Sequence, residues 1–111
     1  MPAAKDNNVV PLLTRQMAEN LLRQAGEDTS KLINTIRYRP KEVWFEVVSY
    51  RQIILCLTEG EIVDGPTRDE HGNFVCTAHR TGAGLDVFVT FAIEPQGENR
   101  VYVLRKEEVL K

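Results

Sequence analysis

The chain has 111 residues, of which 42% are hydrophobic and 27% charged, and its formal net charge is −2. This size and composition are typical of one soluble globular domain. The near balance of 14 basic against 16 acidic residues disfavours nucleic acid as a partner, because proteins that grip a phosphate backbone carry a basic surplus. No apolar run reaches the ~20 residues that span a bilayer. The N-terminus also lacks the apolar region of a signal peptide, so we expect a cytoplasmic protein with no membrane partner.

The N-terminal part of the chain predicts helices. Residues 1–12 show no periodicity, so we expect a flexible N-terminus followed by one domain over residues 13–111. Thr14 is a candidate cap for a first helix, because apolar residues recur after it at helical spacing as far as Gly26. A second, shorter helix is predicted next. Its cap candidates are Asp28, Thr29 and Ser30, and its apolar residues are Leu32, Ile33 and Ile36.

Residues 38–48 favour two different structures. Their β-branched and aromatic residues are typical of a strand. Pro40 in a first turn, followed by an apolar stripe, is typical of a helix. The residues alone leave both alternatives open.

A helix is then predicted to begin at Ser49. Ser49 and Gln52 have the spacing of a capping box, and Val48 and Ile53 have the spacing of a hydrophobic staple. Gly60 is expected to end this helix in the left-handed conformation.

Four strands are predicted after Gly60. The first is short, from Glu61 to Asp64, and Gly65-Pro66 breaks it before a polar loop. The next two alternate in polarity and are separated by a turn at residues 82–84. Their predicted inward residues are Phe74, Cys76 and Ala78, then Leu85, Val87, Val89, Phe91 and Ile93. A last strand from Val101 to Leu104 precedes a charged tail over residues 105–111, which completes an α+β domain with helices packed on one face of a four-stranded antiparallel sheet.

The two cysteines predict no metal site or disulfide. The spacing of Cys56 and Cys76 fits no zinc or redox motif, so we expect two buried thiols. Asp69, His71 and His79 are the remaining candidates for metal ligands, but polar loops of this kind are most often only solvated. We therefore expect no metal and no cofactor.

A basic rim is the one arrangement that suits chemistry on a phosphate. If the strands pair in order, His79, Arg80, Arg105 and Lys106 lie at one edge of the sheet. The candidate catalytic residues are His79, Arg80 and Arg105, with Tyr102 as a further one, and none is assigned as catalytic. The alternative is that charged strand ends serve solubility, which the acidic balance of the chain favours.

From about Ala18 to Ile93 the chain resembles a family of small bacterial proteins known as domain of unknown function 4258, which is distantly similar to RelE-type ribonuclease toxins. The resemblance is carried by Leu22-Arg23, Ser49 to Leu57, Gly60-Glu61-Ile62, Gly65-Pro66, Asp69, Gly72-Asn73-Phe74, Cys76 and Ala83-Gly84. It implies helices on one face of an antiparallel sheet, as in a RelE-like two-layer fold. It also implies a helix over residues 38–46.

The chain departs from this family in that helix. Family members carry a His-Ala pair, then an Arg-Met pair and another Arg. Those positions fall here on Tyr38 for the His, Glu42 and Val43 for the Arg-Met pair, and Glu46 for the second Arg. Carboxylates in place of guanidinium groups repel a phosphate.

The expected function is therefore a non-catalytic protein-interaction or regulatory module. Its partner is either another protein or a second copy of the chain, and Trp44, Phe45 and Phe88 are the candidates for its interaction surface. The alternative is a RelE-like ribonuclease or ribosome-directed toxin, as in toxin–antitoxin pairs.

Overall fold

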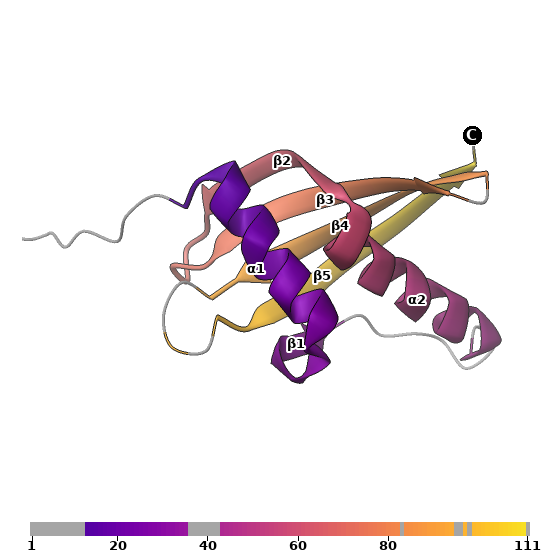
Figure 1. The fold of residues 1–111 in the computed structure, drawn as a ribbon, viewed down its shortest axis with the longest axis horizontal. Helices are drawn as coiled ribbons and strands as arrows, with labels where there is room; N and C mark the ends of the chain where they lie inside the picture. The colour runs from indigo at the N-terminus through magenta and orange to yellow at the C-terminus, as the bar shows by residue number, and fades with distance from the viewer. Residues whose placement is uncertain (1–12, 36–42, 83, 95–96, 98, 111) are drawn as a thin grey trace, which may run out of the picture.

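The computed structural model describes residues 13–35, 43–82, 84–94, 97 and 99–110, and for residues 43–49 it describes the backbone alone. Figure 1 shows two helices lying on the same side of one sheet. The helices are α1 (Arg15–Glu27) and α2 (Val43–Glu59), and a 3₁₀ turn, η1, spans Thr29–Lys31. The strands are β1 (Leu32–Asn34), β2 (Glu61–Arg68), β3 (Phe74–Gly82), β4 (Leu85–Ile93) and β5 (Val101–Leu110). No described helix is both long and apolar enough to cross a membrane.

The α+β class is confirmed, and the four predicted antiparallel strands are present, but the sheet also contains a fifth strand that was not predicted. The sheet has five strands in the order β1-β5-β4-β3-β2, and it is mixed. β2 to β5 pair antiparallel with their neighbours in the chain, whereas β1 pairs parallel with β5. Leu32 and Ile33 thus form a strand, and the second helix predicted around them is wrong over the described residues. Asp28 does act as a cap, but only of η1, where Ser30 N donates to Asp28 Oδ1.

Helix α1 follows the prediction. Met17 N donates to Thr14 Oγ1 over 3.1 Å, so Thr14 caps the helix. Helix α1 buries Ala18, Leu22 and Ala25, which lie on one side at helical spacing. It ends at Glu27, one residue past the predicted stop at Gly26.

Helix α2 is longer than predicted, because it begins at Val43 and runs without interruption through Ser49. The capping box of Ser49 and Gln52 is therefore wrong, and so is the staple built on it. No Gly or Pro lies between Val43 and Glu59, so nothing local stops the helix from extending backwards. Of the two alternatives for residues 38–48, helix is correct for residues 43–48, and residues 38–42 lie outside the described part of the chain.

Gly60 ends α2 as predicted, but for a different reason. It is not among the glycines with positive φ, so the left-handed stop is wrong. A Cβ at this position would lie 2.6 Å from Cys56 O and 3.0 Å from His79 O. Gly60 is thus required because a side chain there would clash with the carbonyl of Cys56 in the last turn of α2, and the carbonyl of His79 in β3 also lies close.

Two strands are longer than their sequence suggests. β2 continues past Gly65-Pro66 to Arg68, with two register shifts against β3. Glycine at position 65 allows the strand to continue here, because a Cβ on this residue would lie only 2.5 Å from Val75 O of β3. β5 continues through the predicted charged tail to Leu110, since β4 offers it a partner along its whole length.

The core lies between the sheet and the two helices. The predicted alternation of β3 and β4 is confirmed, because Phe74, Cys76, Ala78, Val87, Val89, Phe91 and Ile93 are all buried. Leu85, also predicted to point inward, is partly buried against them. Leu22 of α1, and Ile53, Cys56 and Leu57 of α2, pack against this face. We call the opposite side of the sheet, which carries His79, Asp86, Phe88, Thr90 and Arg105, the open face.

Candidate functional site

The end of β3 forms a shallow hollow beside the end of α2. It is lined by Glu59, Glu61, His79, Arg80 and Thr81, with a volume of about 350 Å³. Glu61 lies directly opposite His79 in the β2–β3 register. The hollow is therefore lined by residues of α2, β2 and β3.

His79 is held by three neighbours on the open face. Its Nε2 lies 2.9 Å from Asp86 Oδ1, across the β3–β4 hairpin. Thr81 Oγ1 donates to the same carboxylate oxygen over 2.8 Å. The His79 ring also stacks on Phe88, with ring centroids 4.7 Å apart and planes inclined by 30°. These contacts fix the orientation of the imidazole, which is what a proton-transfer group requires.

Arg80 points to the other side of β3. Its Nε donates to Glu59 Oε1 over 3.0 Å, so its charge is already matched by a carboxylate. Glu61 and Asp86 add two further carboxylates around His79. The hollow is therefore more acidic than basic, which disfavours a phosphate ligand.

The predicted basic rim is divided between the two faces of the sheet. Arg105 lies on the open face, opposite Thr90, and its Nη2 donates to Thr90 Oγ1 over 3.5 Å. Lys106 lies on the covered face, opposite the buried Val89, and bonds to Glu108 over 3.0 Å. Of the four residues of the predicted rim, only His79 and Arg80 line the hollow.

The remaining candidates lie apart from the hollow. Tyr102 is opposite Ala92 and donates to Glu94 Oε2 over 3.4 Å, near the other end of the sheet. Asp69 accepts hydrogen bonds from His71 N and Asn73 N, which closes the turn before β3. His79 lies five residues into β3, about 17 Å along the strand from that turn. Among the described residues no three metal-binding side chains come together.

The predicted interaction residues are only partly described. Phe88 lies on the open face beneath the His79 ring and is half-buried. Trp44 and Phe45 lie in α2, and their side chains are outside the described residues, as are Tyr38 and Glu42 and the side chain of Glu46.

Both cysteines are buried in the core, as predicted. Burial raises the pKa of the Cys56 thiol to about 11 and that of Cys76 to about 12. A thiol with so high a pKa is a poor nucleophile and a poor metal ligand at neutral pH.

The sequence did not point to Glu59, Glu61, Thr81 or Asp86 as neighbours of His79. One signal was available for Asp86, because the tight turn at residues 82–84 fixes the hairpin register and places Asp86 diagonally across from His79. No local signal places Glu59, since it reaches the hollow through the packing of α2. No family model, no curated protein and no solved structure matches this chain.

Proposed function

We propose that this protein is a non-catalytic protein-interaction module that binds an extended strand of its partner along β5. The observation that carries the proposal is the exposed apolar surface of that strand. Leu104, Val109 and Leu110 are 44%, 42% and 82% exposed. Apolar side chains left exposed on an edge strand are a recurrent site of strand addition.

The pairing of β5 supports this proposal. On one side β5 pairs with β4 from Val101 to Leu110. On the other side β1 pairs only with Val101–Val103. In the described part of the chain, no strand pairs with this second edge from Leu104 to Leu110.

The opposite edge of the sheet contrasts with β5. β2 carries Gly65-Pro66 and two register shifts, and irregularities of this kind block the addition of a further strand. β5 has one register shift, near Leu104, and is regular beyond it. The two edges thus differ in their capacity to accept a partner.

Photo-crosslinking in the source cell tests this function. A photoreactive amino acid at Glu107, an exposed residue of β5, is expected to give one discrete crosslinked product. The matched control carries the same group at Gln24, an exposed residue of α1, and is expected to give none. Equal labelling from both positions, or none from either, would overturn the proposal.

A ribonuclease is the second candidate, and the His79–Asp86 pair favours it. An imidazole held by a carboxylate suits general acid–base catalysis. The acidic surroundings of the hollow count against it. This candidate predicts that expression arrests bacterial growth and that His79→Ala relieves the arrest, so harmless overexpression of the native protein would eliminate it.

A further inference from the structure

We infer that the strand bound along β5 is the β5 of a second copy of this chain, in antiparallel orientation, so that two five-stranded sheets join into one. The inference rests on the proposed function and adds the identity of the partner. The stretch concerned is Leu104–Leu110, which we call the β5 edge.

The order of charges along the β5 edge selects the orientation. Arg105 and Lys106 come first, and Glu107 and Glu108 follow. In an antiparallel pair of identical strands, the basic half of one copy lies along the acidic half of the other. In a parallel pair like charges would face each other, which is unfavourable.

The length of the β5 edge selects the register. Because β1 occupies Val101–Val103, a second copy can pair only over the seven residues from 104 to 110. Using all of them places the two-fold axis at Glu107. Lys106 of each copy then lies opposite Glu108 of the other, on the side of the sheet that the helices cover. Leu104 of each copy lies opposite Leu110 of the other.

The residue on the axis is the exception to this complementarity. The two Glu107 side chains face each other on the open face, which is unfavourable, and Arg105 of each copy offsets their charge as the diagonal neighbour across the strands. The arrangement covers Leu110, whose exposed fraction of 82% is the largest among the exposed hydrophobic residues of the described chain. A two-fold axis perpendicular to the sheet keeps both pairs of helices on one side, so the open faces form one continuous surface.

Sedimentation equilibrium of the purified full chain, with three charge variants, tests the inference. The native protein is expected to dimerise. The double variant Arg105→Glu/Lys106→Glu should weaken the dimer by about tenfold or more, because it turns attractive cross-strand pairs into repulsive ones. The quadruple variant, which adds Glu107→Lys and Glu108→Arg, restores the complementary order and should restore the dimer.

The control variant Arg15→Glu/Arg51→Glu makes the same change of charge on exposed helix residues and should dimerise like the native protein. Circular dichroism establishes that each variant is folded. A native protein that is monomeric at every concentration, or a quadruple variant that stays as weak as the double one, would overturn the inference. If the chain is monomeric but Glu107 crosslinks a different protein in the cell, the proposed function stands and the second copy is wrong.

Discussion

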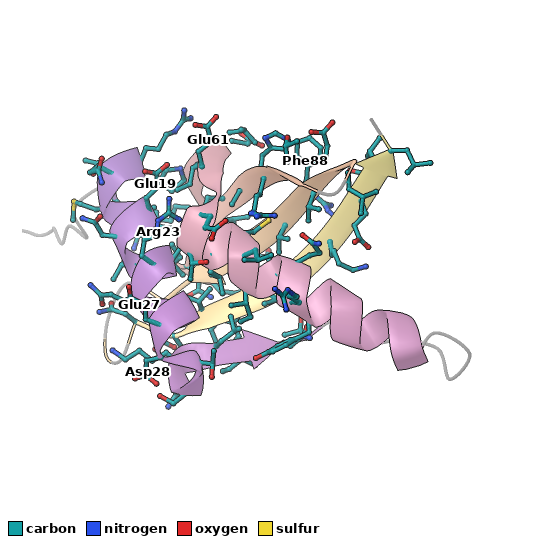
Figure 2. All side chains as sticks on the ribbon, turned by 45° about the vertical axis from the view of Figure 1, so that its right-hand side comes forward. Glu19, Arg23, Glu27, Asp28, Glu61 and Phe88 are labelled. Carbon is teal, nitrogen blue, oxygen red and sulfur yellow. The ribbon has the colours of Figure 1, made fainter. Side chains whose placement is uncertain are left out.

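The guanidinium of Arg23 closes the end of a helix to which it does not belong. From α1, its Nη1 donates to Leu57 O over 2.7 Å and its Nη2 to Gly60 O over 2.6 Å. Figure 2 shows Arg23 on the flank of α1 that faces α2. Two carbonyls at the end of α2 are thus satisfied by a cation, which the helix dipole also favours.

We therefore expect Arg23→Ala to lower the free energy of unfolding by about 2 kcal/mol, because two charged hydrogen bonds are lost at once. Urea denaturation measures the change. Gln24→Ala, at the exposed neighbouring position, is the matched control and should stay within about 0.5 kcal/mol of the native protein. Equal stability of the two variants would show that the contacts of Arg23 are not stabilising.

Gly60→Ala is expected to destabilise the protein by about 2 kcal/mol, since the new methyl group meets two backbone carbonyls that cannot move aside. Gly84 is a useful control because its φ is +77° and a Cβ there meets no atom of the described residues within 4 Å. Asn tolerates this conformation, so Gly84→Asn should change stability by only about 0.5 kcal/mol. Thermal unfolding of both variants tests the difference, and a tolerated Gly60→Ala would contradict the close approach of these two carbonyls.

Thr14→Ala should cost about 1 kcal/mol, because the amide of Met17 loses its acceptor at the start of α1. Thr14→Ser keeps a hydroxyl at the same place and should retain most of the stability. The comparison by urea denaturation separates capping from the loss of a methyl group. Equal losses in the two variants would rule out capping.

Gln52 carries a buried polar atom that is unpaired within the described part of the chain. The residue is 8% exposed, and its Oε1 accepts no hydrogen bond from any described residue. Gln52→Met removes this atom at similar volume and should raise stability by about 1 kcal/mol. Gln24→Met on the exposed side of α1 is the control, and a clear loss of stability in Gln52→Met alone would contradict the prediction.

Stability should fall as the pH rises from about 9 towards 11 or 12. The pKa values of the folded Cys56 and Cys76 are raised to about 11 and about 12 from an ordinary 9.0, so in this window the thiols of the unfolded chain lose protons while those of the folded chain keep them. Proton release then favours unfolding. Urea denaturation at pH 8 and pH 10 measures the fall, and the variant Cys56→Ala/Cys76→Ala should show a smaller one.

Thiol accessibility gives an independent check of the same two residues. An aromatic disulfide reagent at pH 8 should react with neither cysteine in the folded protein and with both in urea. Rapid reaction without denaturant would contradict their burial.

Local patterns predicted the elements that depend on local chemistry. The cap at Thr14 and the alternation of β3 and β4 needed only the nearest residues along the chain. β1 could not be found in this way, because Leu32 and Ile33 become a strand only through pairing with β5, at the other end of the domain. The start of α2 was predicted at Ser49 instead of Val43, because Ser49 and Gln52 have the spacing of a capping box. The same two residues are also compatible with the interior of a helix.

In the candidate site, too, local sequence predicted some residues, and others could be placed only by tertiary structure. His79 and Arg80 were found because they end a clear strand, whereas Glu59 and Glu61 join them only through tertiary packing. The full length of β5 was not predicted, because the charged residues 105–108 are typical of a solvated tail. In the structure these residues form a strand because β4 provides a pairing partner along their whole length. Partner strands, more than local propensity, decided where each of these strands ended.

The parallel pairing of β1 with β5 has a consequence for synthesis. Leu32 and its partner Val101 are 69 residues apart in the chain. At translation rates of about 5 to 20 residues per second, β1 waits roughly 3 to 14 s before its partner strand has been made. During that time the antiparallel pairs of β2, β3 and β4 can form between neighbours, and β5 later completes the sheet on one side while receiving β1 on the other. The nascent chain thus carries an unpaired Leu32–Asn34 segment until β5 has been synthesised.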